Sequence, residues 1–157
     1  MEKFPLTKFG FTSLEEELKR LKSVDRPNII AAIDEARSHG DLSENAEYSA
    51  AKEKQSFIEG RIKELEAVIS RAQIIDPSTV QGKIVRFGAT VAVVDVDSDI
   101  ESSYQIVGDY EADIEKNKIS ISSPLAKALI GKEEGDEIEY FAPAGKKSFE
   151  ILSVMYK

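Results

Sequence analysis

Two runs of apolar residues, each spaced by three and four positions, constrain the fold of this chain more than any other feature. Leu14, Leu18 and Leu21 begin the first run, and a longer run follows after residue 41. This spacing places apolar side chains on one face of a helix. Two long helices joined by a turn of a few residues run antiparallel, so the sequence predicts a helical hairpin. The expected apolar face of the second helix consists of Ala46, Ala50, Phe57, Ile58, Ile62, Leu65, Ile69 and Ala72.

Local signals predict the ends of the first helix. Thr12–Ser13 precedes an acidic first turn and is typical of a helix start. A proline follows further along, so we expect a kink or a short break near Val24–Pro27. His39–Gly40 ends the helix, with the glycine as a left-handed C-cap. The result is a narrow rod whose tip spans about residues 39–48.

The second half of the chain has alternating β-branched residues in place of helical spacing. Pro77 disfavours helix at the residue before it, so we place the boundary between a hairpin domain, residues 1–76, and a second domain, residues 77–157. One short helix is expected at residues 125–130, and the strands around it are antiparallel, which makes the second half a small α+β domain. The predicted strands cover residues 83–87, 89–95, 102–107, 118–121, 137–141 and 148–154.

Composition narrows the possible functions. The formal net charge is -8, which argues against holding nucleic acid through a bulk positive field and leaves only a local basic patch for such contact. The chain has no Cys and a single His, so thiolate and His-rich metal sites are ruled out. No apolar run is long enough for a membrane helix, and the N-terminus lacks the features of a signal peptide. We therefore expect a cytoplasmic protein without membrane contact.

The densest cluster of polar residues lies at the expected tip, between Arg37 and Tyr48. One interpretation is structural: Asp41 and Glu44, three residues apart, resemble a capping box at the start of the second helix. The other is functional: the same two carboxylates are presented from the tip toward a metal ion. Mg²⁺ usually needs ligands beyond two carboxylates, so such a tip would be half of a metal site that another molecule completes.

A longer motif surrounds these two acids. The run from Glu35 to Tyr48 reads EARSHGDLSENAEY. It resembles the tip of the bacterial Gre transcript-cleavage factors, whose signature is His-Gly-Asp-Leu-x-Glu-Asn-Ala-Glu-Tyr between two long helices. The resemblance covers essentially the whole chain and keeps the order. The further matching segments are Lys22–Val24, Arg26–Ile30, Phe57–Ile62, Phe87–Val91, Tyr104–Gly108, Ser122–Ala126 and Ala128–Lys132.

The resemblance implies both a fold and a function. It implies an N-terminal antiparallel coiled-coil hairpin and a C-terminal FKBP-like antiparallel sheet with one short helix. In this family the rod enters the secondary channel of RNA polymerase and stimulates the polymerase's own Mg²⁺-dependent cleavage of backtracked RNA, which rescues arrested complexes. The chain would then be a monomer that is not itself an enzyme. It would have no cofactor of its own, and its partners would be RNA polymerase and the 3′ end of the nascent RNA.

The resemblance also implies roles for residues at the tip. Asp41 and Glu44 correspond to the acids that help hold the shared Mg²⁺ and its attacking water; Asp41 is the expected ligand, and Glu44 is a ligand or a water-orienting group. Arg37 and Lys52 correspond to a basic patch that meets the RNA, although by themselves they are equally typical of solvated helix charges. Ser43 stands where a basic residue is common in relatives, which fits the GreA type better than the GreB type.

Three residues near these features carry simpler expectations. His39 is expected to be a turn residue rather than a metal ligand, and Tyr48 to support the tip by packing. Ser123 caps a short helix that opens with Pro124. By resemblance, this Ser123–Pro124 corner contacts the rim of the polymerase.

Two other functions remain open at this point. One is a regulator that occupies the polymerase channel without stimulating cleavage; the intact acidic pair argues against it. The other is a peptidyl-prolyl isomerase, suggested by the FKBP-like second domain. That activity needs an aromatic-lined pocket, and this chain has no Trp and only scattered Tyr and Phe in its second half. Fold alone does not confer function.

Overall fold

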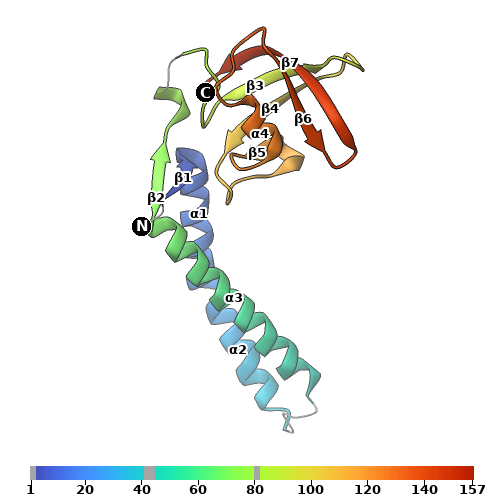
Figure 1. Cartoon of the computed structure of the whole chain (residues 1–157). Coiled ribbons are helices and arrows are strands. Elements are labelled where there is room, and N and C mark those ends of the chain that lie inside the picture. Colours follow the sequence, from blue (N-terminus) through green and yellow to red (C-terminus); the bar gives the residue numbers. More distant parts are fainter. Residues whose placement is uncertain (1–2, 41–44, 80–81) are drawn as a thin grey trace. The chain divides into compact units, whose positions relative to one another are not determined.

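The computed structural model describes residues 3–40, 45–79 and 82–157 (Figure 1). By internal contacts the chain divides into two compact units. The hairpin unit is Thr12–Ala72, and the sheet unit combines Lys3–Phe11 with Gln73–Lys157. The predicted boundary after residue 76 places residues 3–11 with the hairpin. They belong to the sheet unit by contacts because they contain a strand and a helix start that bond to it.

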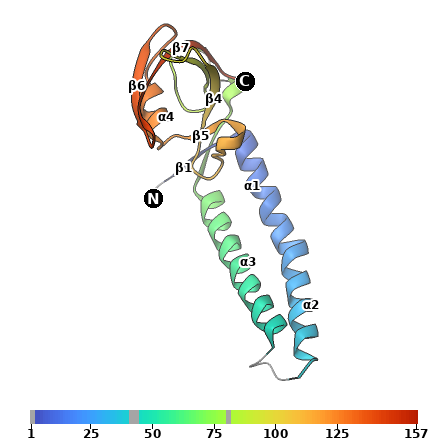
Figure 2. The same cartoon turned by 90° about the vertical axis from the view of Figure 1, so that its right-hand side faces the viewer.

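The hairpin unit contains the long helices of the chain. In both Figure 1 and Figure 2, helices α2 and α3 lie side by side along the arm. The helical elements are α1 (Lys8–Arg20), the π-helical turn η1 (Leu21–Asp25), α2 (Arg26–Arg37) and α3 (Ala46–Ser70). This arrangement confirms the predicted antiparallel hairpin.

The predicted interruption near Val24–Pro27 is confirmed as the π-helical turn η1. The backbone N–H of Arg26 bonds to the carbonyl of Leu21, five residues back, instead of the usual four. Pro27 lies in the first turn of α2 and has no N–H with which to continue the helical hydrogen bonds. The chain therefore inserts one extra residue and continues as a helix, rather than breaking.

The predicted start at Thr12–Ser13 is wrong, because α1 begins at Lys8. Thr7 supplies the missing cap: its Oγ1 accepts a hydrogen bond from the N–H of Gly10 at 3.0 Å. A threonine at this position is a strong N-cap. It starts the helix about one turn before Thr12–Ser13, the start that the acidic residues after them had suggested.

One continuous line of apolar side chains is buried between the two arms of the hairpin. It differs from the predicted face of the second helix: Ala46, Ala50 and Phe57 are exposed, and Phe57 is 72% accessible. Successive side chains on a helix point about 100° apart, so the neighbour of a buried residue lies on a different face. A predicted apolar face that is shifted by one position therefore includes exposed side chains. The buried residues are Leu14, Leu21, Ile29, Ile33 and Ala36 on the first arm and Ala51, Ile58, Ile62, Leu65 and Val68 on α3.

The sheet unit contains a five-stranded sheet in the order β5-β4-β3-β7-β6. Neighbouring strands are antiparallel except β4 and β5, which are parallel. The mainly antiparallel sheet and the short helix confirm the two-domain α+β prediction. The elements are β3 (Thr90–Asp95), β4 (Glu101–Val107), β5 (Lys118–Ser120), α4 (Pro124–Leu129), β6 (Glu137–Ala142) and β7 (Gly145–Met155), with short 3-10 turns η2 (Pro77–Thr79) and η3 (Ile114–Lys116).

The core of the sheet unit is a single apolar cluster. The helix α4 covers part of it and contacts β6 and β5. The pairing of β3 with β7 shifts register between Ala92 and Val93, which is a β-bulge. The buried members of the cluster are Val85, Ala89, Val91, Val93, Ile106, Ile119, Leu125, Ala126, Leu129, Ile138, Phe149 and Ile151.

Two short strands were not predicted. β1 (Phe4–Thr7) and β2 (Ala72–Ile75) form a two-stranded sheet. β1 lies very close to the end of β4, since a Cβ on Gly108 would be 2.1 Å from the carbonyl oxygen of Pro5. Four-residue strands with a proline in one of them carry too little alternation to be predicted from sequence.

The strand expected at residues 83–87 does not form. Ile84 makes only an isolated bridge with Glu133. The backbone of Val85 instead exchanges hydrogen bonds with the loop after α4: its N–H donates to Lys132, and its carbonyl accepts from Gly131. Val85 is fully buried in the apolar core while Ile84 and Arg86 beside it are exposed, which explains why the segment alternates like a strand.

Candidate functional site at the hairpin tip

The two acids predicted to carry the chemistry, Asp41 and Glu44, lie outside the described residues. The structure describes the chain on both sides of them, up to Gly40 and from Asn45 onward. The contacts of these two flanks show how the helix ends are arranged where the tip begins.

The end of α2 unwinds over three residues. Ser38 is the C-cap. The N–H of His39 donates to the carbonyl of Ala36 at 3.2 Å, and the N–H of Gly40 donates to the carbonyl of Arg37 at 3.3 Å. Gly40 has a φ of 101°, which confirms the predicted left-handed glycine at this end. A side chain at this φ would strain the backbone, so the glycine permits the chain to turn away from the helix.

The start of α3 is capped by Asn45. Its Oδ1 accepts a hydrogen bond from the N–H of Tyr48 at 3.1 Å. Its Nδ2 donates to the carbonyl of Ala36, in the last turn of α2, at 2.8 Å. Among the described residues, α3 begins at Ala46 and its N-cap is Asn45. The capping box predicted for Asp41 and Glu44 lies outside these residues.

Sequence reasoning missed Asn45, although a signal was present. Asparagine is among the strongest N-cap residues, and Glu47 places an acid in the first turn after it. The Asp-x-x-Glu spacing of Asp41 and Glu44 competes with this signal, because a capping box has the same form.

A second pair of side chains joins the two flanks. His39 Nε2 lies 3.7 Å from a carboxylate oxygen of Glu47. Both side chains are more than half exposed, so this contact contributes little to stability. Tyr48 is half-buried.

The basic residues predicted to meet RNA lie on separate helices. Arg37 is the last residue of α2 and is exposed. Lys52 is exposed on α3, and its Nζ lies 3.2 Å from the Oε1 of Gln55. The sequence expectation that they flank the tip from the two arms agrees with these positions, while contact with RNA stays a prediction.

Ion pairs join the arms below the tip. Arg26 makes two hydrogen bonds of 2.8 Å to the carboxylate of Glu59. Arg61 holds Glu17 in the same two-point manner, at 2.7 and 3.0 Å. The bond from Arg26 lowers the pKa of Glu59, and the bond to Glu17 raises the pKa of Arg61. Such paired geometry orients two helices as well as attracting them.

In the sheet unit, Ser123 acts as the predicted cap. Its Oγ accepts from the N–H of Ala126 at 3.2 Å, and Pro124 opens α4 and is exposed. A neighbouring hydroxyl network was not predicted: Ser120 and Ser122 both donate to Oδ1 of Asp109, Ser122 at 2.7 Å. These two bonds lower the pKa of Asp109.

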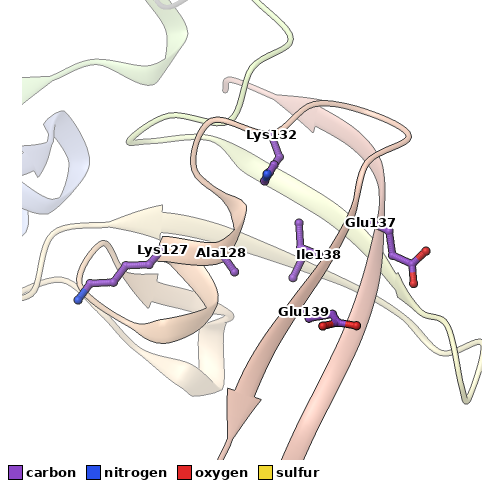
Figure 3. A pocket seen from close by; sticks show the side chains of 6 residues that line it. All are labelled: Lys127, Ala128, Lys132, Glu137, Ile138 and Glu139. Carbon is purple, nitrogen blue, oxygen red and sulfur yellow. The ribbon is translucent and has the colours of Figure 1, made fainter.

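The sheet unit also has a cleft of about 710 Å³ between α4 and β6 (Figure 3). Figure 3 shows Ala128 and Ile138 facing the space between these elements, with Lys127 directed away from it. None of the six lining residues is aromatic. They are Lys127, Ala128, Lys132, Glu137, Ile138 and Glu139.

Two features of the described residues bear on metal and membrane binding. Across residues 3–40, 45–79 and 82–157, no three His, Cys, Asp or Glu side chains come together in a way that could hold a metal ion. Among the helices that the structure describes, none is both long enough and apolar enough to cross a membrane.

An antiparallel helical hairpin followed by a mainly antiparallel sheet unit places the chain among two-domain α+β proteins. A family profile described as the N-terminal domain of transcription elongation factors GreA and GreB matches residues 4–74. The profile of their C-terminal domain matches residues 80–156. The chain belongs to the GreA/GreB family of transcription elongation factors.

Individual relatives agree with this assignment. The chain is 62% identical to the transcription elongation factor GreA of Hyphomonas neptunium over 100% of both chains. It is 63% identical to that of Ruegeria pomeroyi over 99% of both chains. Among solved structures, GreA factor homolog 1 of Thermus thermophilus is 30% identical, with a TM-score of 0.45 and coverage of 98% of this chain and 99% of that one.

Proposed function

We propose that this protein is a transcript-cleavage factor. It enters the secondary channel of RNA polymerase with its hairpin tip and stimulates the polymerase's own cleavage of backtracked RNA. The observation that carries the proposal is full-length similarity, at 62% identity, to a protein named transcription elongation factor GreA. The tip sequence supports it, because both acids of the family's signature, Asp41 and Glu44, are present.

The donor set of the tip fits Mg²⁺. Carboxylate oxygens are hard ligands of the kind that Mg²⁺ prefers, and Asp41 and Glu44 would supply them. Two carboxylates do not complete a magnesium site, so the remaining ligands would come from the polymerase. A second metal ion in such a site stabilises the attacking and leaving oxygens of a phosphodiester displacement. The protein then has no cofactor of its own and is not itself an enzyme.

The other proposed contacts follow the same geometry. Arg37 and Lys52, on the two arms, would neutralise phosphates of the nascent RNA near its 3′ end. Ser123 and Pro124, at the start of α4, would contact the polymerase rim. The protein would act as a monomer in the cytoplasm, since one tip would suffice for one channel.

The two alternative functions have less support. A channel regulator that does not stimulate cleavage has no need of two tip acids. A prolyl isomerase would need an aromatic pocket, and the cleft between α4 and β6 is lined by Lys, Glu, Ala and Ile side chains.

The decisive experiment adds the purified protein to a backtracked elongation complex with labelled RNA and Mg²⁺. The wild-type protein is expected to release short 3′ fragments. Asp41→Ala is expected to slow this release by about tenfold or more, the effect of losing only about 1.4 kcal/mol of transition-state stabilisation. Asp41→Ala should still compete with labelled wild-type protein for the polymerase, because its helices and sheet are unchanged.

Glu53→Ala is the matched control, since it removes an exposed acid from α3 away from the tip motif. It should cleave like the wild type. Equal stimulation by the wild type, Asp41→Ala and Glu44→Ala would reject a metal role for the tip. Slowed nucleotide addition without any short RNA from the wild type would favour the channel regulator.

A further inference from the structure

We infer that Asn45 is a positioning residue for transcript cleavage: its one amide side chain ties the end of α2 to the start of α3 and so sets the anchor points of the acidic tip. The inference rests on the proposed function. It assigns no contact with metal or RNA to Asn45. It assigns this residue the task of holding the two helix ends at a defined separation.

The geometry uses both functional atoms of the side chain. Oδ1 accepts from Tyr48 at 3.1 Å, and Nδ2 donates to the carbonyl of Ala36 at 2.8 Å. The first N–H groups of a helix and its last carbonyls have no partners within the helix. Asn45 Oδ1 therefore satisfies one such N–H of α3, and its Nδ2 gives the carbonyl of Ala36 a second, shorter bond beside the one from the N–H of His39 at 3.2 Å. Ala36 is 2% exposed, so water cannot easily replace this bond to its carbonyl.

The identity of the residue supports this role. Aspartate and serine cap helix N-termini about as well as asparagine does, so the bond to Tyr48 alone does not select asparagine. Only the amide adds an N–H donor at the reach that Ala36 requires. An aspartate would place a second acceptor against that carbonyl, at the negative end of the α2 dipole.

The position of Asn45 in the chain links these bonds to function. Asn45 follows Glu44 directly, and Ala36, the second-last residue of α2, lies shortly before Asp41 in the chain. The Asn45–Ala36 bond therefore closes the segment that carries both acids. Catalytic groups lose much of their effect when they are displaced by about 1 Å, so loosening this closure is expected to reduce cleavage without removing an acid. The exposed His39–Glu47 pair gives weaker support to the same closure.

The test compares Asn45→Asp with Asn28→Asp. Asn45→Asp keeps the cap of α3, replaces the donor to Ala36 with an acceptor and adds one negative charge. Asn28→Asp makes the same charge change at an exposed position of α2. Cleavage by each variant is measured at saturating factor and over a range of Mg²⁺ concentrations, together with competition for polymerase. Hydrogen exchange is followed in residues 36–40 and in the first turn of α3.

The expected result for Asn45→Asp has four parts. The cleavage rate falls by about tenfold, the scale of a misplaced catalytic group. The Mg²⁺ concentration for half-maximal cleavage rises. Competition for polymerase stays within about twofold of the wild type, and exchange speeds up at residues 36–40 while the first turn of α3 stays protected. Asn28→Asp changes none of these quantities. Asn45→Ser, which keeps the cap but has no amide, should resemble Asn45→Asp.

Several outcomes would overturn the inference. If Asn45→Asp cleaves at the wild-type rate and with the wild-type dependence on Mg²⁺, the bond to Ala36 has no positioning role. Equal loss of cleavage and of polymerase binding, with faster exchange throughout α3, would reduce Asn45 to a purely structural residue. If the wild-type protein stimulates no cleavage at all, the proposed function fails instead. In that case hydrogen exchange remains a separate test. Unchanged exchange at residues 36–40 in Asn45→Asp would show that the Asn45–Ala36 bond does not hold the two helix ends together.

Discussion

The hairpin unit and the sheet unit are stabilised in different ways. The sheet unit buries residues from several strands and from α4 in one cluster, so each side chain contacts parts of the chain that are distant in sequence. The hairpin unit buries a single line of side chains, and charged pairs such as Arg26–Glu59 flank that line. A shared core couples its members, whereas a line of contacts can open one segment at a time.

This difference predicts where mutations act. A change in the sheet core should weaken the whole sheet unit, and a change in the hairpin should act mainly on nearby turns. Hydrogen exchange is the appropriate measurement, because it reports opening free energies segment by segment.

The largest effect is expected for Leu129→Ala. Leu129 is fully buried in α4 against the sheet, so the substitution leaves a cavity that costs about 2–5 kcal/mol. Exchange should speed up throughout β3 and β7, while α3 exchanges as in the wild type.

The adjacent Ile130 supplies the control, because it is 37% exposed. Ile130→Ala should cost about 1 kcal/mol or less, since Ile130 buries less apolar surface than the fully buried Leu129. If Leu129→Ala accelerates exchange in α3 as much as in β3, the two units unfold together and the comparison fails.

A smaller effect is expected for Glu111→Ala, which tests how residues 3–11 belong to the sheet unit. Glu111 accepts hydrogen bonds of 2.6 Å from both the N–H and the Oγ1 of Thr7, and one of 3.2 Å from the N–H of Gly108. Thr7 is only 3% exposed, so its donors would be left without good partners. The expected cost is about 1–3 kcal/mol. Exchange should speed up in β1 and at the start of α1.

Glu115→Ala is the control for that experiment, since Glu115 is an exposed acid in the same loop region. Hydrogen exchange in Glu115→Ala should match that of the wild type in β1 and at the start of α1. Unchanged protection of β1 in Glu111→Ala would mean that strand pairing and the burial of Leu6 are sufficient to hold this segment.

The types of most long elements were predictable from sequence. Three-and-four spacing gave the helices, and alternation gave β3, β4, β6 and β7, because one face of each element is buried. The π-helical turn was predictable as an interruption, since a proline cannot continue the hydrogen bonds of a helix. Its form was not, because a kink, a break and an inserted residue all accommodate Pro27.

The remaining differences come from long-range contacts. β1 and the earlier start of α1 depend on Thr7, whose partner Glu111 lies 104 residues away. The backbone of Val85 bonds to the loop after α4 instead of to a strand, and no local pattern reveals that partner. At the candidate site, the acids Asp41 and Glu44 were found through a family motif rather than through spacing. Asn45 was missed because its second bond, to Ala36, crosses between two helices.

The smallest effect is expected at the exposed ion pairs of the hairpin, and it depends on pH. The hydrogen bond from Arg26 lowers the pKa of Glu59 below its ordinary value of 4.5. A carboxylate with a lowered pKa stabilises the folded state above its unfolded pKa, and this contribution is lost as the pH falls through the folded pKa. The thermal stability of the hairpin should therefore fall slightly on acidification below about pH 4.5.

Glu59→Gln removes the titrating group and should flatten this part of the pH profile. The matched control is Glu66→Gln, because Glu66 meets Lys22 at the longer distance of 3.6 Å and without a two-point hydrogen bond. Circular dichroism of the helices, recorded against temperature between pH 3 and 7, measures both variants. High salt should reduce the difference between the wild type and Glu59→Gln, because the pair is partly exposed. A salt-independent loss as large as that of Leu129→Ala would mean that the hairpin depends on its charges as much as the sheet unit depends on its core.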